Sequence, residues 1–339
     1  MNIFDVYKEF ILRNKHVGPN IQLIPIPEKQ YSFQYVGGQI YKNKLYSIVN
    51  SAEKMLVFDI NKNTFSFLGQ FGRTDFKWTG GCVFEDVFYL FPRLSKHLLA
   101  YNLITCEFAN VDCNFLYEGE HHYGGVCTSN GFVYQPPRNT DHILKWDLKK
   151  RCCEKIVISK GEKLRFCGSI LHPNGFLYFL PEQNLPIIKM DVKTDSITFI
   201  DCPKQCFAFD PKIAADGNIY AFSSSNGIVK IDTKTDTVSV LYGERYIGAY
   251  GTKVGVNGKF YSLPGDTNEI LEFDPFTGEL KECAYLNEKH EVHYAGGAVD
   301  VNGNIYALPV HADEILKISF DGVADEIPKE LYGFFSDCY

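Results

Sequence analysis

The segment GGAVDVNGNIYALP at residues 296–309, followed by EILKI at residues 314–318, contains the pattern that decides the fold. Apolar and polar residues alternate within it, and the dipeptide Asn302-Gly303 separates its two halves. Alternation with a period of two is typical of β-strands, and Asn-Gly favours a tight hairpin turn. The segment therefore predicts a strand, a turn, a strand, a loop and a further strand.

Variants of this segment recur along the chain at intervals of 40 to 45 residues. The positions equivalent to its first two residues are Gly37-Gly38, Gly80-Gly81, Gly124-Gly125, Gly168-Ser169, Pro211-Lys212, Gly251-Thr252 and Gly296-Gly297. Repeats of this length with four short strands each are typical of propeller blades. We therefore predict an all-β fold, a seven-bladed β-propeller of four-stranded antiparallel blades.

The first turn of each repeat has a characteristic composition. It is Asn-Gly or Asp-Gly in five repeats, and Asn43-Lys44 and Glu85-Asp86 in the other two. We expect type I′ hairpins here, because both central residues of such a turn need a positive φ. Acidic residues that end third strands, such as Asp191 and Asp232, are expected to hydrogen-bond turn backbone rather than to catalyse a reaction.

Over residues 21–330, the pattern G-x(5–6)-N/D-G-x-I/F-Y-x-x-P followed by I-L-K-I-D-x-x-T resembles the repeats of the YVTN, NHL and virginiamycin B lyase-like group of seven-bladed propellers. Kelch-like repeats are the second choice, since the glycine pair opens the first strand and only Trp78 and Trp146 are present. The resemblance implies the fold. It leaves the function open, because propellers include both enzymes and binding scaffolds.

The two ends of the chain require separate interpretation. Apolar residues at helical spacing within residues 2–14 predict a short amphipathic helix over one end of the fold. Residues 1–20 are assigned to this helix and a lead-in, and residues 21–339 to a single propeller domain. Residues 21–26 and residues 323–328 both read as outer strands, so either segment could close the ring.

Composition restricts the classes of partner. The net charge of −7 argues against a globally basic nucleic-acid binder. Residues 1–9 carry charges where a signal peptide needs an apolar core, and no apolar run is long enough to span a membrane. The 11 cysteines lack the spacing of a disulfide framework or zinc site. We expect a cytoplasmic monomer with free cysteines that binds neither nucleic acid nor membrane.

One face of the predicted propeller carries the candidate site. Loops that enter each first strand and loops between second and third strands should emerge together around the central channel, where binding groups concentrate. The candidate ligand-binding residues there are Gln34, Tyr35, Lys77, Trp78, Arg93, His122, Arg138, Arg165, Tyr294 and His311. The arginines suit a carboxylate or phosphate, which they can hold through paired hydrogen bonds.

Three functions are consistent with this face. The first is docking of a protein or peptide, with Trp78 as an anchor, and the second is binding of a small anionic ligand without catalysis. The third is a metal- or His-dependent lyase or hydrolase with a shallow site. This third function is included because virginiamycin B lyase-like propellers, which the repeats resemble, use a metal and a histidine on this face. Its candidate catalytic residues are His121, His293 and Glu120. No cofactor is certain, and a divalent metal belongs only to this enzymatic alternative.

Overall fold

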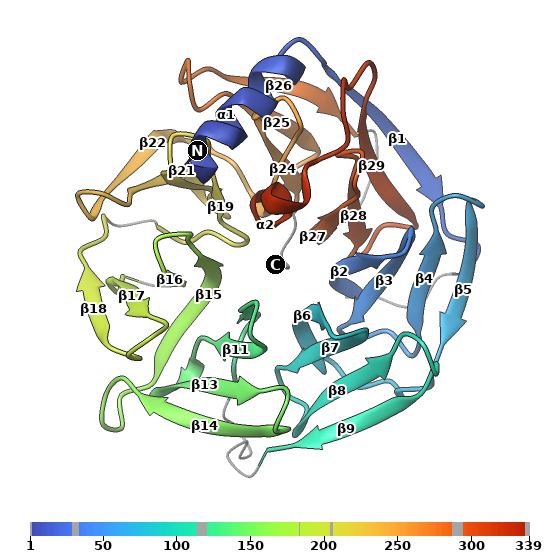
Figure 1. The fold of residues 1–339 in the computed structure, drawn as a ribbon, viewed down its shortest axis with the longest axis vertical. Coiled ribbons are helices and arrows are strands. Elements are labelled where there is room, and N and C mark those ends of the chain that lie inside the picture. Colours follow the sequence, from blue (N-terminus) through green and yellow to red (C-terminus); the bar gives the residue numbers. More distant parts are fainter. Residues whose placement is uncertain are drawn as a thin grey trace.

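The computed structural model of the 339-residue chain describes residues 2–28, 34–113, 121–182, 184–203, 206–286 and 294–335. Its strands form seven sheets arranged radially around a central axis (Figure 1). The predicted seven-bladed propeller is therefore confirmed. Within each blade the strands pair antiparallel, from the innermost strand at the axis to an outermost strand at the rim.

The strands have the following bounds. Blade 1 comprises β2 (Tyr35–Tyr41), β3 (Lys44–Val49), β4 (Met55–Asp59) and β5 (Thr64–Leu68), and blade 2 comprises β6 (Trp78–Phe84), β7 (Val87–Pro92), β8 (His97–Asn102) and β9 (Phe108–Asp112). Blade 3 comprises β10 (Val126–Cys127), β11 (Phe132–Gln135), β13 (His142–Asp147) and β14 (Cys152–Val157), and blade 4 comprises β15 (Leu164–Leu171), β16 (Phe176–Pro181), β17 (Ile187–Asp191) and β18 (Ile197–Ile200). Blade 5 comprises β19 (Lys212–Ile213), β20 (Ile219–Phe222), β21 (Asn226–Asp232) and β22 (Thr237–Tyr246), and blade 6 comprises β23 (Ala249–Val254), β24 (Phe260–Pro264), β25 (Glu269–Phe273) and β26 (Leu280–Tyr285). Blade 7 comprises β27 (Tyr294–Val299), β28 (Ile305–Pro309), β29 (Glu314–Phe320) and β1 (Pro19–Pro25), and a short strand β12 (Arg138–Thr140) joins blades 3 and 4.

The ring is closed by β1, which comes from the opposite end of the chain to the rest of blade 7. It pairs antiparallel with β29, from Pro19 opposite Phe320 to Pro25 opposite Glu314. The segment at residues 21–26 is thus the one that closes the ring. Residues 323–328 form no strand and lead instead to a 3₁₀ turn, η1 (Lys329–Leu331), and the helix α2 (Tyr332–Phe335).

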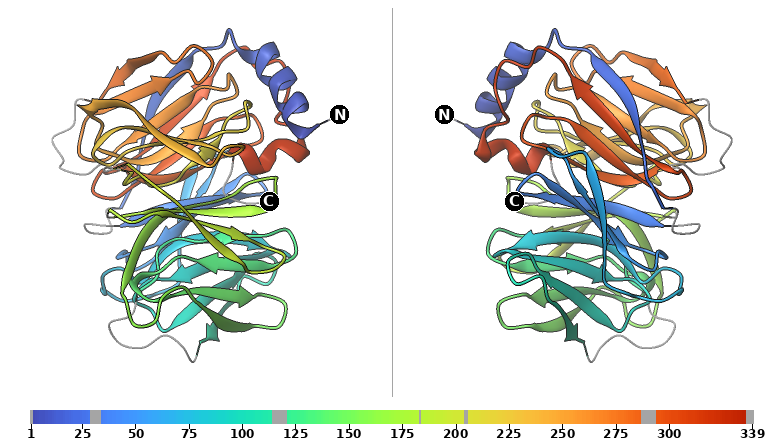
Figure 2. Two further views of the ribbon diagram at one scale, coloured as in Figure 1. Left: turned by 90° about the vertical axis from the view of Figure 1, so that its left-hand side faces the viewer. Right: turned by 90° about the vertical axis from the view of Figure 1, so that its right-hand side faces the viewer.

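Two helices lie on the face of the hairpin turns, and one of them, α2, reaches the end of the central channel. The predicted N-terminal helix is present as α1 (Ile3–Asn14), and the Asn2 side chain caps it by accepting a hydrogen bond from the Phe4 amide at 3.2 Å. The rings of Tyr7 and Phe334 in α2 lie 4.6 Å apart, and Gly333 of α2 lines the channel. Figure 2 shows both helices on the same side of the disc. Neither is long or apolar enough to cross a membrane, and the same holds for every helix in the described ranges.

Three of the four glycine pairs lie inside the innermost strands, and Gly124-Gly125 directly precedes β10. The register of β2, β6 and β27 with the adjacent strand shifts by one residue at the pair, so each pair forms a bulge. A Cβ added to Gly80 would lie 2.8 Å from the Cα of Gly124 in the next blade, and one added to Gly296 would lie 2.8 Å from the Cα of Gly37. Gly80 also has a φ of 82°. Only glycine combines this conformation with this contact.

The hairpin turns differ in part from the prediction. Glu85 and Asp86 both have positive φ, as do Lys42 and Asn43, so the first two blades have turns of the expected kind. In the five Asn-Gly and Asp-Gly turns only the glycine has positive φ. These turns are longer, as in blade 3, where the Thr128 amide donates to the Phe132 carbonyl at 2.8 Å. A turn followed by a left-handed glycine is the usual alternative to the two-residue hairpin.

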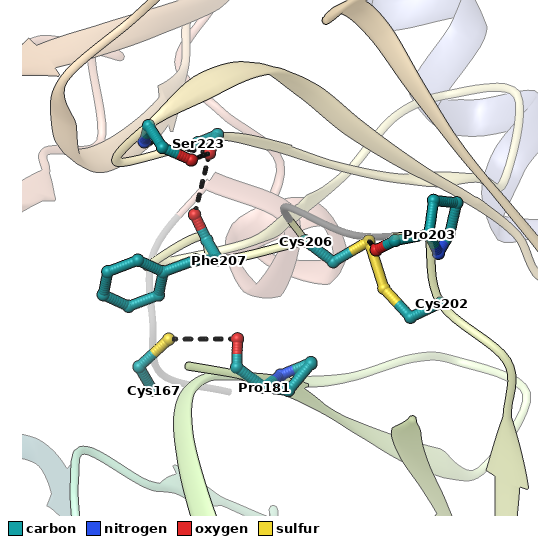
Figure 3. The surroundings of a disulfide bond; sticks show 8 residues. Cys167, Pro181, Cys202, Pro203, Cys206, Phe207 and Ser223 are labelled. Atoms are coloured by element: carbon teal, nitrogen blue, oxygen red, sulfur yellow. Dashed lines mark hydrogen bonds between the residues drawn. A yellow bond between two sulfur atoms is a disulfide. The ribbon is translucent and has the colours of Figure 1, made fainter. Parts of the chain in front are cut away.

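The expectation that all cysteines are free is wrong for four of them. Cys113 is disulfide-bonded to Cys153, and Cys202 to Cys206. The first bond joins the outer parts of blades 2 and 3, and the second closes a short loop between blades 4 and 5 (Figure 3). Cysteine spacing does not reveal the first pair, because its members are 40 residues apart and become neighbours only when the blades are adjacent. The other cysteines in the described part of the chain are not disulfide-bonded.

The contact between Gly80 and Gly124 can be tested with Gly80→Ala. We expect this variant to lower the free energy of unfolding by roughly 2–5 kcal/mol, because the new methyl group meets backbone and the φ is unfavourable. Gly278→Ala is the control, since Gly278 has a φ of 75° with open space around it. It should lose only about 1–2 kcal/mol. Urea unfolding followed by circular dichroism measures both, and equal losses would contradict the steric explanation.

The Cys113–Cys153 bond can be tested by peptide mapping without reductant, which should recover these two cysteines joined. Under oxidising conditions Cys153→Ser should lower the free energy of unfolding by about 4 kcal/mol, the value that chain entropy predicts for a loop of this length. Cys152→Ser removes the exposed neighbouring thiol and should leave stability unchanged. A reductant should abolish the difference between wild type and Cys153→Ser. A bridge through Cys152 would refute the assignment.

Candidate functional site

The candidate site is the mouth of the channel on the face opposite α1 and α2. Its floor is a row of three aromatic side chains from blades 3, 5 and 6, namely Tyr123, Phe209 and Tyr250. Phe209 lies between the other two, with ring centroids 5.6 Å from Tyr123 and 5.4 Å from Tyr250. We call these three residues the aromatic row. All three line a cavity of about 130 Å³ in the channel.

Three arginines lie beside one end of this row. The short strand β12 crosses from blade 3 to blade 4 and places Arg138 directly opposite Arg165 of β15. Like charges opposite each other on paired strands are destabilising. Glu182 reduces the repulsion, because its Oε1 accepts hydrogen bonds from Arg138 at 2.9 Å and from Arg165 at 2.8 Å. Its Oε2 is buried and accepts none from the described residues.

Arg93 is the third member of this arginine cluster. Its guanidinium group lies 4.0 Å from the ring centre of Phe76 and 5.4 Å from that of Tyr123, and the Arg138 guanidinium lies 4.6 Å from the same Tyr123 ring. The Arg93 guanidinium makes no hydrogen bond or ion pair with any residue in the described ranges. Burial lowers its pKa to about 10, so the group stays charged at neutral pH. The mouth therefore presents a half-buried cation without a carboxylate partner among the described residues.

The charge around the cluster is positive. The three guanidinium groups face one carboxylate, that of Glu182, which pairs with Arg138 and Arg165. His121 lies next to them, and its backbone carbonyl accepts a hydrogen bond from the Arg138 amide at 2.9 Å. Burial lowers the pKa of His121, and the charges of Arg93, Arg138 and Lys163 lower it further. His121 is therefore neutral at neutral pH, in surroundings that attract anions and repel metal cations.

Several predicted ligand-binding residues are buried between loops. The Gln34 side chain donates to the Ala312 carbonyl at 3.2 Å, and the Trp78 indole donates to the His97 carbonyl at 3.2 Å. Lys77 donates to the carbonyls of Gly72 and Thr74, and burial lowers its pKa to about 8. Tyr35 and Tyr294 are fully buried. The structure does not bring these side chains together with the arginine cluster.

The predicted histidines are dispersed. His122 is fully buried, with its Nε2 3.2 Å from the His142 carbonyl oxygen, and His311 is half-buried in blade 7. His293 and Glu120 lie outside the described residues. Within the described ranges, no three His, Cys, Asp or Glu side chains lie close enough together to hold a metal ion. The part of the proposed catalytic group that the structure describes is thus His121 alone.

The aromatic row was not singled out as a unit by the sequence, although a positional signal exists. The residue immediately before each first glycine position lines the channel cavity in six blades: Val36, Thr79, Tyr123, Cys167, Asp210 and Tyr250. The sequence interpretation placed the ring of channel residues two and three positions before the glycine. The bulge at the glycine pair shifts the register of the innermost strand. The prediction took those positions because the chain enters the innermost strand there, whereas the structure turns the residue next to the glycine toward the channel.

Comparison with known proteins shows similarity at the level of structure. No protein-family model and no curated protein matches the sequence. A streptogramin B lyase structure is similar with a TM-score of 0.74 and 15% identity, covering 89% of this chain and 98% of the other. Virginiamycin B lyase from Staphylococcus aureus, as the selenomethionine protein, gives 0.74 and 14%, covering 89% and 99%. A catalytically inactive form of that lyase with quinupristin gives 0.72 and 14%, covering 89% and 99%.

At these identities the similarity concerns the fold. The seven-bladed propeller that the sequence repeats predict is the one found in these lyase structures, over nearly the whole of each lyase chain. The chain therefore has the fold of the virginiamycin B lyase-like propellers.

The burial of His122 predicts a pH dependence of stability. Burial, and the neighbouring His142, lower its pKa to about 3, whereas an unfolded histidine titrates near 6.5. Below pH 6.5 the unfolded chain therefore binds a proton that the native protein does not, and stability falls as the pH decreases from about 6.5 to 3. The loss from this residue is at most about 1.4 kcal/mol per pH unit.

His122→Gln should reduce this acid sensitivity, because glutamine does not titrate and can still donate to the His142 carbonyl. Urea unfolding at pH 7 and pH 5 measures the difference for wild type and variant. His16→Gln, which changes an exposed histidine, is the control and should retain the wild-type pH dependence. An unchanged pH dependence in His122→Gln would show that other groups cause the acid sensitivity.

Proposed function

We propose that this propeller is a binding protein whose channel mouth holds the anionic group of a ligand, a carboxylate or a phosphate. The observation that carries the proposal is Arg93, a half-buried guanidinium group without an acceptor among the described residues. A desolvated charge is costly unless it is paired, and guanidinium groups bind carboxylates and phosphates through two parallel hydrogen bonds. An anionic ligand would supply the missing acceptors.

The surroundings of Arg93 support the same function. Arg138 and Arg165 lie next to it and share only Glu182, so an incoming anion meets an excess of positive charge. Phe76 and Tyr123 pack against the guanidinium group and fix its orientation, which lowers the entropy lost on binding. The aromatic row offers an apolar surface to the rest of the ligand.

The similar structures bear the name of lyases, and lyase activity is the alternative for this site. In this chain it would depend on His121, His293 and Glu120, of which the structure describes only His121. The cations around His121 favour an anion there rather than a divalent metal. Anion binding is thus the better-supported function, and a docked protein or peptide would reach the site through a carboxylate or phosphate of its own.

Arg93→Ala tests the proposal. Isothermal titration with benzoate and phenyl phosphate should show binding to wild type that weakens at least tenfold in the variant, because a hydrogen-bonded ion pair contributes about 1.5–3 kcal/mol. Arg13→Ala is the matched control, since Arg13 lies on α1 at the other end of the channel and pairs with Asp325. Raising the salt concentration should weaken binding to wild type.

Equal affinity of wild type and Arg93→Ala for both anions would place the binding site elsewhere. Failure of wild type to bind either anion at millimolar concentration would reject anion binding at the mouth.

A further inference from the structure

The far end of the aromatic row carries an unpaired acid. Asp266 lies in the loop between β24 and β25, where its backbone amide donates to the Gly248 carbonyl at 2.9 Å. Its Oδ2 accepts hydrogen bonds from the hydroxyls of Tyr246 at 3.1 Å and Tyr250 at 3.2 Å. Burial, and the charge of Asp266, raise the pKa of Tyr250 to about 12, so its hydroxyl remains a donor at neutral pH.

The second oxygen of Asp266 remains open. No hydrogen bond to Oδ1 comes from the described residues, and no lysine, arginine or histidine among them pairs with this carboxylate. Asp266 is exposed at the surface, and its neighbour Tyr250 lines the channel cavity. Among the described residues, the mouth thus has a cation without a carboxylate at one end, Arg93, and a carboxylate without a cation at the other.

The two ends are connected by the aromatic row. Tyr123 contacts Arg93, and Tyr250 donates a hydrogen bond to Asp266. Phe209 lies between these two tyrosines, with its ring centroid 5.6 Å from that of Tyr123 and 5.4 Å from that of Tyr250. These distances match a small molecule rather than a single functional group. An apolar ligand body of that length would cover the row while its ends reach the two charges.

The middle of the row is held in place by blade 5 and by a disulfide. The carbonyl oxygen of Phe207, two residues before Phe209, accepts hydrogen bonds from the Ser223 hydroxyl at 2.9 Å and the Ser224 amide at 3.0 Å. The preceding residue, Cys206, is bonded to Cys202 (Figure 3). Fixed aromatic side chains give a preformed surface, so little ordering entropy is lost when a ligand binds.

We infer that the mouth binds a zwitterion whose carboxylate or phosphate contacts Arg93, whose protonated amine contacts Asp266 Oδ1, and whose apolar body lies on the aromatic row. The Arg93 end of this inference rests on the proposed function, and the Asp266 end is independent of it. A ligand with an anionic group alone would leave Asp266 unpaired and would gain nothing from it. A ligand with both groups pairs both charges, and an amine distinguishes it from a simple anion.

Short peptides with a central phenylalanine provide matched probes. Gly-Phe, Gly-Phe-Gly and Gly-Phe-Gly-Gly separate amine from carboxylate by increasing distances, since an extended chain gains about 3.3–3.6 Å per residue. Each is compared with its N-acetylated form, which lacks the amine charge, and its C-amidated form, which lacks the carboxylate. Isothermal titration is carried out on wild type, Arg93→Ala, Asp266→Asn and the control Asp325→Asn.

We expect binding to depend on both the amine and the carboxylate of the peptide. For the best-fitting peptide, acetylation should weaken binding to wild type at least tenfold, and Asp266→Asn should abolish the difference between free and acetylated forms. Amidation should weaken binding at least tenfold in wild type and have no further effect in Arg93→Ala. Asp325→Asn, on the opposite face, should behave as wild type. The amide introduced by Asp266→Asn retains an acceptor oxygen for the two tyrosines, so folding should be preserved, which circular dichroism checks.

Two outcomes overturn the inference and separate it from the proposed function. Equal binding of free and acetylated peptides to wild type rejects the zwitterion and leaves anion binding intact. The same conclusion follows if wild type binds benzoate but binds none of the peptides. Failure of wild type to bind benzoate, phenyl phosphate and every peptide rejects both. An acetylation effect that persists in Asp266→Asn shows that another group recognises the amine and also overturns the inference.

Discussion

The close approach of the innermost strands around the channel is the constraint on which the structure depends. At Gly80 and Gly296 a Cβ atom would lie 2.8 Å from the backbone of the next blade, so these positions have no room for any side chain. Each pair also carries the bulge that shifts the register of its strand. This close approach explains why a glycine pair recurs in four of the seven blades, those of Gly37, Gly80, Gly124 and Gly296.

The same bulge positions the candidate site. The residue before each first glycine is turned toward the channel, and this is where Tyr123 and Tyr250 enter the aromatic row. Arg138 reaches the mouth differently, on a short strand that leaves blade 3 and pairs with blade 4 opposite Arg165. That pairing of like charges is unfavourable by itself, and the hydrogen bonds that both arginines donate to Glu182 oppose the repulsion. A pair of like charges on neighbouring strands breaks a local rule of sheet stability, and such exceptions are expected at functional sites.

Access to the channel is asymmetric because the two ends of the chain meet on one face. The strand β1 completes blade 7 by pairing with β29, and α1 and α2 pack together over the hairpin turns. The aromatic row, the arginine cluster and Asp266 all lie on the other face. With the helices on one face, the loops of the other face are the surface where a ligand can bind.

The sequence alone determined the number of blades, the N-terminal helix, the face that carries the arginines and the turn residues of the blades, because each follows from local periodicity or from backbone preference. Tertiary structure decided the rest. The choice of residues 21–26 over 323–328 to close the ring, the Cys113–Cys153 bond and the meeting of Arg93 with Tyr123 all join residues from different blades. Periodicity within one repeat carries no information about such contacts. The bulge also changes which side chain faces the channel, so Tyr123 and Tyr250 became identifiable only once the blades were in place.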